Sequence, residues 1–243
     1  SPVHARGSMW RTPFVPLRRT LDRLHRTLRR LLVALTASLR GWWPRQLTTT
    51  RHRYYVLFKP CTVLCSFESD TARAAVKGRT PRTTLGDLEL PIGVHHVGRL
   101  DRDSEGLLLL TDDGHFTHEV LHGRRHPKRY WALVTGHPEA EALEAMARGG
   151  LHIRGRETKP ASVRRLTRSE LPTLPPHCSD GQEPSTWLEV ILHEGMNRQV
   201  RRMTKHAGHY TIRLVRAGVG RLRLEDLGLR PGECRPIAAS DVV

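Results

Sequence analysis

The sequence predicts an α+β fold with a large mixed, mostly antiparallel sheet flanked by helices and loops. Short apolar or alternating segments typical of strands outnumber helix patterns from residue 54 onward. Strand and helix patterns do not alternate regularly, as they would in a parallel α/β fold. At 243 residues the chain can bury a sizeable core in one or two domains.

The clearest element is a strand at residues 107–110, which are four consecutive leucines. The run is too short for a typical helix and suits a strand that is buried on both faces. A turn at 112–114 (Asp-Asp-Gly) ends it. An earlier strand pattern at 54–58 stops at Lys59-Pro60. The other elements expected up to residue 184 are a polar loop at 66–82, a short helix or turn at 85–90, a strand at 94–97, a helix at 116–121, a strand at 128–134, a helix at 139–148, a strand at 161–166 and a surface loop at 172–184.

The C-terminal third begins with an alternating strand at 186–193, whose leucines and valine share one face. A turn leads into a basic helix at 197–206, for which Asn197 is the expected N-cap and Gly208 the end. Two strands, at 211–219 and 222–227, follow, and a tail at 232–237 closes the domain.

Residues 1–8 resemble an expression scar that precedes Met9. Residues 9–53 form a basic N-terminal arm, in which leucines at three- and four-residue steps predict an amphipathic helix. An RNA-binding arm that orders on contact is our preferred interpretation. An organelle transit peptide, a membrane-surface helix and a misassigned start codon remain alternatives. The apolar run is too short to span a bilayer.

The formal net charge of +16 indicates a polyanionic partner, and arginine far outnumbers lysine. Charge alone does not separate RNA from DNA, or an enzyme from a passive binder. The four cysteines do not form a disulfide framework at this length, and Cys61 and Cys65 lack the matching second pair of a zinc site. Reduced thiols in a cytoplasmic protein are the simpler interpretation.

A charged loop at 99–105 runs directly into the leucine strand. Its Asp101 is flanked by Arg99 and Arg102, an arrangement that keeps a carboxylate ionised and partly shielded from water. An ordinary surface loop with charge pairs has the same composition.

The basic helix carries arginines at positions that share one face, Arg198, Arg201 and Arg202. They indicate a solvated basic face, a phosphate-binding face at a helix N-terminus, or an arginine that pairs with a carboxylate.

The segment Gly-Arg-Leu-Asp-x-x-Ser-x-Gly-Leu-Leu at 98–108 resembles the active-site motif of the pseudouridine synthases. The continuation Leu-Leu-Thr-Asp-Asp-Gly is similar to the branch that modifies single uridines in ribosomal RNA. Lys-Pro at 59–60, Lys-x-Tyr at 128–130 and Glu-Gly-x-Asn-Arg-Gln-Val-Arg-Arg-Met at 194–203 follow the order of that branch. The resemblance covers roughly residues 54–237.

The resemblance implies a pseudouridine synthase catalytic domain at 54–243. Relatives often carry an N-terminal S4 domain, but the arm is too short and lacks the strand pattern, so we expect none here. Within the family the chain is most similar to the E-type branch, which acts on 23S rRNA of the large ribosomal subunit. One departure is Met196, where relatives usually have arginine.

The resemblance also implies roles for individual residues. Asp101 would be the nucleophile, Tyr130 would pack against the target base and help remove the proton at C5, and Arg201 would pair with the Asp101 carboxylate. An aspartate acts as a nucleophile only while ionised, and a tyrosine offers a flat ring to a base. No metal or cofactor is expected. The residues expected to bind RNA are Lys59, Arg99, Arg102, Lys128, Arg198 and Arg202.

We therefore expect isomerisation of one uridine of 23S rRNA to pseudouridine by a cytoplasmic, monomeric bacterial enzyme with no membrane partner. Its substrate is the large-subunit rRNA, either free or in a pre-ribosomal particle. Two alternatives stand beside it: the same chemistry on small-subunit rRNA or tRNA, and a non-catalytic factor for rRNA binding or assembly.

Overall fold

The computed structural model describes residues 52–123, 125–177 and 184–243. The scar at 1–8 and residues 9–51 of the arm at 9–53 lie outside the described residues, and so does the question of an S4 domain. Residues 52–243 form one compact unit. No helix among the described residues is long and apolar enough to cross a membrane.

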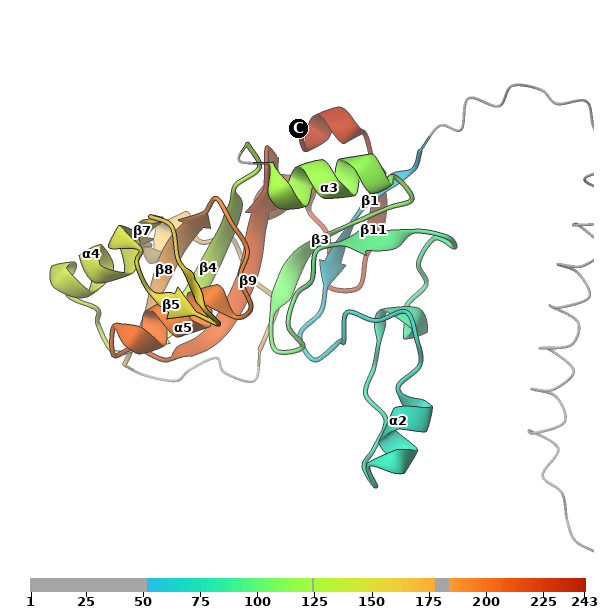
Figure 1. Ribbon diagram of the computed structural model, residues 1–243, viewed down its shortest axis with the longest axis horizontal. Helices are drawn as coiled ribbons and strands as arrows, with labels where there is room; N and C mark the ends of the chain where they lie inside the picture. The colour runs from blue at the N-terminus through green and yellow to red at the C-terminus, as the bar shows by residue number, and fades with distance from the viewer. Residues whose placement is uncertain (1–51, 124, 178–183) are drawn as a thin grey trace, which may run out of the picture. The chain divides into compact units, whose positions relative to one another are not determined.

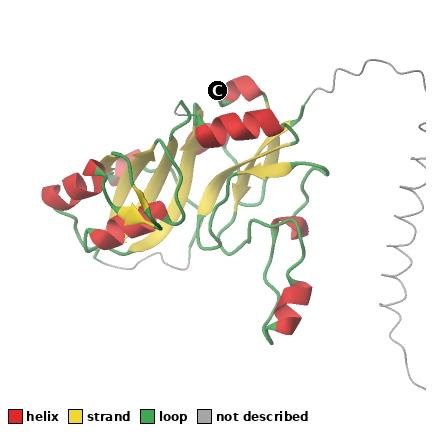
Figure 2. Cartoon of the chain, in the orientation of Figure 1, coloured by secondary structure: helices red, strands yellow, loops and turns green. Residues whose placement is uncertain are grey.

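The described residues contain eleven strands and five α-helices (Figures 1 and 2). The strands are β1 (Tyr54–Lys59), β2 (His95–Val97), β3 (Glu105–Thr111), β4 (Lys128–Thr135), β5 (His152–Ile153), β6 (Arg156–Glu157), β7 (Ser162–Arg165), β8 (Ser185–Leu192), β9 (Thr211–Val219), β10 (Leu222–Arg223) and β11 (Cys234–Ile237). The helices are α2 (Thr71–Val76), α3 (Gly114–His122), α4 (Ala140–Arg148), α5 (Gln199–His206) and α6 (Leu224–Leu227). Short 3-10 turns lie at Leu85–Asp87, Arg168–Glu170 and Ala239–Asp241.

Nine of these strands form one sheet with the order β11-β1-β3-β9-β4-β8-β7, in which β2 also pairs with β3 and β10 with β9. The pair β3–β9 is parallel, and the other pairs of this sheet are antiparallel. The expected α+β fold with a large mixed, mostly antiparallel sheet is therefore confirmed. The remaining strands, β5 and β6, form a separate hairpin.

Strand β3 is buried on both faces, as its leucine run predicts. Leu107 and Leu109 pack with Phe116 of α3 in one core cluster. Leu108 and Leu110 face the other way, into a second cluster that the segment after β1 covers. Because side chains alternate along a strand, only a continuous apolar run can fill two cores at once.

A third core cluster lies between the β4–β8 part of the sheet and helices α4 and α5. Alternate residues of β8 (Leu188, Val190 and Leu192) face it, and Met146 of α4 and Met203 of α5 cover them. Figure 1 shows both helices beside β8. The candidate site lies where this core meets the loop before β3, as its lining residues show.

Three expectations about local structure are wrong, and one hairpin was missed. The loop expected at 66–82 contains α2, which lies on a segment that extends away from the sheet (Figure 1). The strand expected at 222–227 is a two-residue strand followed by α6, because Leu224 turns into the core. The hairpin β5–β6 was not expected. Helix α5 begins at Gln199, so Asn197 is not its N-cap.

Candidate active site

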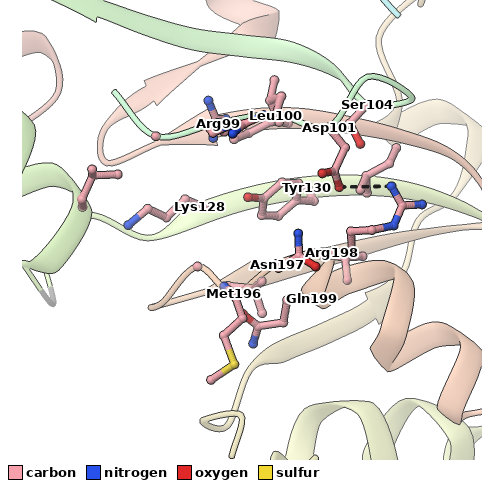
Figure 3. A pocket seen from close by; sticks show the side chains of 17 residues that line it. Arg99, Leu100, Asp101, Ser104, Lys128, Tyr130, Met196, Asn197, Arg198 and Gln199 are labelled. Carbon is pink, nitrogen blue, oxygen red and sulfur yellow. Dashed lines mark hydrogen bonds and ion pairs between the residues drawn. The ribbon is translucent and has the colours of Figure 1, made fainter. Parts of the chain in front are cut away.

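A cavity of about 410 Å³ lies between three elements: the loop at 98–104, the exposed end of the sheet at β4 and β9, and the loop at 195–198. Figure 3 shows Asp101 on the first of these, Tyr130 and Lys128 along the strand, and residues 196–198 on the facing loop, with Gln199 at the start of α5. The three elements are far apart in the sequence, so the cavity exists only in the folded chain.

The sheet contributes side chains by its alternation. Lys128 and Tyr130 are two residues apart on β4, and Leu214 and Arg216 are two residues apart on β9. All four line the cavity, and Tyr130 lies opposite Arg216 in the β4–β9 register. Residues spaced by two on a strand share a face, which places a tyrosine ring and two cations on one wall.

The Asp101 loop is anchored from β1. The Lys59 side chain is fully buried, and its ammonium donates hydrogen bonds of 2.8 Å to the carbonyls of Pro60 and Ser104. Burial lowers the pKa of Lys59. The expectation that Lys59 binds RNA is wrong, because the ammonium faces the protein interior and fixes the end of the loop.

Two further backbone hydrogen bonds hold the same loop. Thr62 N donates to the Arg102 carbonyl at 2.7 Å, and Leu100 N donates to the buried Cys65 Sγ at 3.3 Å. The loop therefore has defined contacts on both sides of Asp101. These contacts fix the position of the Asp101 carboxylate relative to the cavity.

Asp101 is one third exposed, and its Oδ2 lies 3.4 Å from Nη1 of Arg198 (dashed line in Figure 3). Arg198 also donates to both carboxylate oxygens of Asp103, at 3.0 and 2.9 Å. Burial alone would raise the pKa of Asp103, but these hydrogen bonds and the nearby charges of Arg201 and Arg198 outweigh it, so its pKa lies below the ordinary value. Asp103 is therefore the anion that holds Arg198 beside Asp101.

Arg201 does not make the expected pair with Asp101; Arg198 makes it instead. The Arg201 guanidinium donates to the Asp103 carbonyl at 2.6 Å and to the Thr211 carbonyl at 3.1 Å. These bonds tie the Asp101 loop to the start of β9. Its Nε is buried without a hydrogen-bond partner and lies 3.5 Å from Oδ2 of Asp103, and burial lowers the pKa of Arg201.

The facing loop is held by a buried pair of side chains. Gln199 Nε2 donates to Glu194 Oε1 at 2.7 Å, and Met196 N donates to Gln199 Oε1 at 3.0 Å. Arg198, at the N-terminal boundary of α5, adopts a left-handed backbone with φ of 54°. A non-glycine residue rarely takes this conformation, and the contacts with Asp103 and Asp101 help to hold it.

Residues 53–206 match the family model described as RNA pseudouridylate synthase. The chain belongs to this family. It is therefore a pseudouridine synthase, and RNA is its substrate.

Relatives and a solved structure agree with this assignment. The chain is 44% identical over 185 residues to "Ribosomal large subunit pseudouridine synthase E" of Xanthomonas campestris, covering 74% of this chain and 92% of the relative. It is 33% identical over 190 residues to "Ribosomal large subunit pseudouridine synthase B" of Bacillus subtilis, covering 78% and 69%. A solved pseudouridylate synthase matches with a TM-score of 0.60 and 27% identity, covering 79% of this chain and 73% of that chain.

The residues expected to bind RNA occupy different places in the synthase. Arg99 and Arg102 are exposed on the Asp101 loop, and Arg99 lines the cavity. Arg202 is half-buried and donates to Asn197 Oδ1 at 3.3 Å. Lys128 is 6% exposed and donates to the Val120 carbonyl at 2.9 Å. Lys128 thus belongs to the cavity wall and is not part of an outer phosphate-binding surface.

Sequence reasoning missed two residues of the synthase site, Asp103 and Arg216. A signal for Arg216 was present, since it is one of two arginines in a largely apolar strand and shares the face of Leu214. Gly106 also contributes: a Cβ there would lie 2.4 Å from the Arg216 carbonyl oxygen, so only glycine lets β3 approach β9 this closely. Nothing in the spacing of Asp103 distinguishes it from a surface acid.

Proposed function

We propose that this synthase isomerises one uridine of 23S rRNA to pseudouridine, with Asp101 as the nucleophile. The observation that carries the proposal is the Asp101 carboxylate, held by Arg198 at the edge of a cavity that Tyr130 also lines. The choice of RNA rests on similarity to relatives named for the large ribosomal subunit.

The chemistry needs three events at one uridine. The Asp101 carboxylate bonds to ribose C1′ while the bond from C1′ to N1 breaks, and uracil leaves with the electron pair. The base rotates, C5 bonds to C1′, and Asp101 leaves as a carboxylate. The proton on C5 is then lost and N1 gains a proton, so the product is an isomer of the substrate.

The side chains fit these events. The Tyr130 ring offers a flat apolar surface to uracil, and its hydroxyl is our candidate for helping to remove the C5 proton. Arg198 forms an ion pair with the Asp101 carboxylate, and Arg201 positions the loop through the Asp103 carbonyl. The pairing role that the sequence suggested for Arg201 passes to Arg198, and Arg201 acts as a positioning residue.

The target nucleotide has to leave its stack to enter the cavity. Arg99 and Arg102 are exposed beside Asp101 and are placed to hold the flanking backbone. We further propose that residues 54–243 are the catalytic domain, that the basic arm at 9–53 adds affinity for RNA, and that the synthase works as a monomer in the cytoplasm. The rRNA can be presented free or in a pre-ribosomal particle.

Pseudouridine mapping tests this proposal directly. Ribosomal RNA and tRNA from cells that lack the gene are compared after complementation with wild type or Asp101→Asn. The change keeps the size of the side chain but removes its charge, so we expect one large-subunit site to be lost in the deletion and restored by wild type alone. Incubation of the purified enzyme with free 23S rRNA and with precursor particles identifies which form is modified.

Other outcomes correct separate parts of the proposal. If a small-subunit or tRNA site disappears instead, the reaction is right and the substrate is wrong. If Asp101→Asn restores the site fully, Asp101 is not the nucleophile. If no RNA changes in the deletion, the chain is a binding or assembly factor on the synthase fold.

A further inference from the structure

Two buried cations line the cavity, and neither has a carboxylate partner within residues 52–123, 125–177 and 184–243. Arg216 is 5% exposed, and its guanidinium donates one hydrogen bond within the described residues, from Nε to the Leu107 carbonyl at 2.6 Å. Its Nη2 is buried and has no hydrogen-bond partner among the residues that the structure describes. Lys128 is 6% exposed and donates to the Val120 carbonyl. Across the part of the chain that the structure describes, neither residue forms an ion pair.

Burying positive charge without an anion is unfavourable, and a second cation nearby adds repulsion. Burial and the charge of Arg216 both lower the pKa of Lys128. Donating to the carbonyls of Leu107 and Val120 does not explain the charges, because a neutral donor would serve the carbonyls without the burial cost. The wall therefore attracts an anionic group that enters the cavity.

That group is separate from the Asp101 carboxylate, which forms its ion pair with Arg198. Figure 3 shows the Tyr130 ring between the Lys128 side chain and Asp101. The cavity is also lined by the apolar side chains of Leu121, Leu192 and Leu214. These apolar side chains suit the faces of a flat base, whereas the exposed Arg99 and Arg102 on the outer loop are the candidates for contact with RNA phosphates.

We propose that Lys128 and Arg216 bind the carbonyl oxygens of the target uracil and stabilise its negative charge while it is detached from ribose. This inference rests on the proposed isomerisation. When the bond from C1′ to N1 breaks, the electron pair stays on the base, where N1, O2 and O4 share it. The charge disappears when C5 bonds to C1′, so Lys128 and Arg216 stabilise the short-lived state more than the substrate.

Donors that already point at the developing charge in a shielded site do not have to reorient during the reaction. Removing one such donor typically lowers the rate by about 100-fold. The test compares Lys128→Met with the matched control Lys205→Met, which removes a lysine that is exposed on α5 and does not line the cavity. Single-turnover cleavage of the bond from C1′ to N1 is measured on the target RNA with uridine or 5-fluorouridine at the site. Circular dichroism checks folding.

We expect Lys128→Met to detach uracil about 100-fold more slowly than Lys205→Met, with the same RNA affinity and salt dependence. The loss should be at least fivefold smaller with 5-fluorouridine, because fluorine itself stabilises the anion. Arg216→Lys keeps the charge, but a lysine cannot donate to both the Leu107 carbonyl and the base. This variant should therefore also detach uracil more slowly than wild type. This second variant carries the test if Lys128→Met does not fold.

Three results would overturn the inference: rates within threefold of wild type, an equal loss with both bases, or weaker binding with a shallower salt slope at an unchanged rate. The last would make Lys128 a phosphate contact. These failures differ from failure of the proposed function, in which wild type makes no pseudouridine or Asp101→Asn remains active.

Discussion

Lys59→Met should destabilise the fold without changing the affinity of the protein for RNA. The Lys59 ammonium is fully buried and donates to two carbonyl oxygens, those of Pro60 and Ser104. Leaving a buried acceptor unsatisfied costs about 1–3 kcal/mol, so the two together lose about 2–6 kcal/mol. Methionine also removes the cost of burying a charge, which offsets part of this loss. We therefore expect the free energy of unfolding to fall by about 3 kcal/mol, in the lower half of the range.

For a unit the size of residues 52–243, a loss of about 3 kcal/mol lowers Tm by about 6–12 °C. Thermal unfolding followed by circular dichroism measures this shift, with Lys77→Met as the matched control, because Lys77 is exposed just after the end of α2. RNA affinity across a salt series should have the same slope in both variants, because Lys59 reaches no phosphate.

The pH dependence gives an independent check. Burial lowers the pKa of Lys59, so between its folded-state pKa and the ordinary value of 10.5 the unfolded chain binds more protons than the folded one. Stability contributed by Lys59 therefore rises with pH across this window. The difference in unfolding free energy between wild type and Lys59→Met should grow in the same direction. A Tm within 2 °C of wild type, or a salt slope lower by about one, would refute the buried role.

Two further predictions concern the Asp101 loop and the start of β1. Arg201→Lys should slow single-turnover pseudouridine formation about 10- to 100-fold at unchanged RNA affinity. The reason is that a lysine cannot donate to the Asp103 and Thr211 carbonyls together, as the guanidinium does. A rate within twofold of wild type would exclude the positioning role. Tyr54 donates to Asp113 at 2.7 Å, and this hydrogen bond is the main cause that raises the pKa of Tyr54 to about 12. Because the pKa is raised in the folded state, Tyr54 stabilises the fold below pH 10, and this stabilisation is lost as the pH rises from 10 to about 12. Tyr54→Phe should therefore lower the free energy of unfolding by about 1 kcal/mol at pH 7 and abolish the alkaline loss, as measured by denaturant titrations. An unchanged alkaline profile would contradict the assignment.

The sequence by itself determined most of the strands of the large sheet and the location of the Asp101 loop. The leucine run of β3 and the alternation of β8 are local patterns whose period follows from backbone geometry. The family motif placed Asp101 in the loop before β3 and Tyr130 on β4, and the structure brings both to one cavity. These features survive without tertiary information because each depends on residues within one short segment.

Only the tertiary structure decided which basic side chains are buried and which of them pairs with Asp101. Lys59 is buried and Arg198, rather than Arg201, pairs with Asp101, because burial and pairing depend on which segments meet in space. Helix α2 escaped prediction in part because Asp70, which precedes it, accepts hydrogen bonds from Arg79 and from the backbone of Arg82 in the later loop.

The wall formed by Lys128 and Arg216 shows the same limit. The two residues come from β4 and β9, which are distant in the sequence and adjacent in the sheet. The pattern of β9 could show that Arg216 shares a face with Leu214, but it could not show that this face borders the cavity. Charge in a sequence records only that a cation exists, whereas its exposure, its partner and the group it can bind are set by the contacts that folding creates.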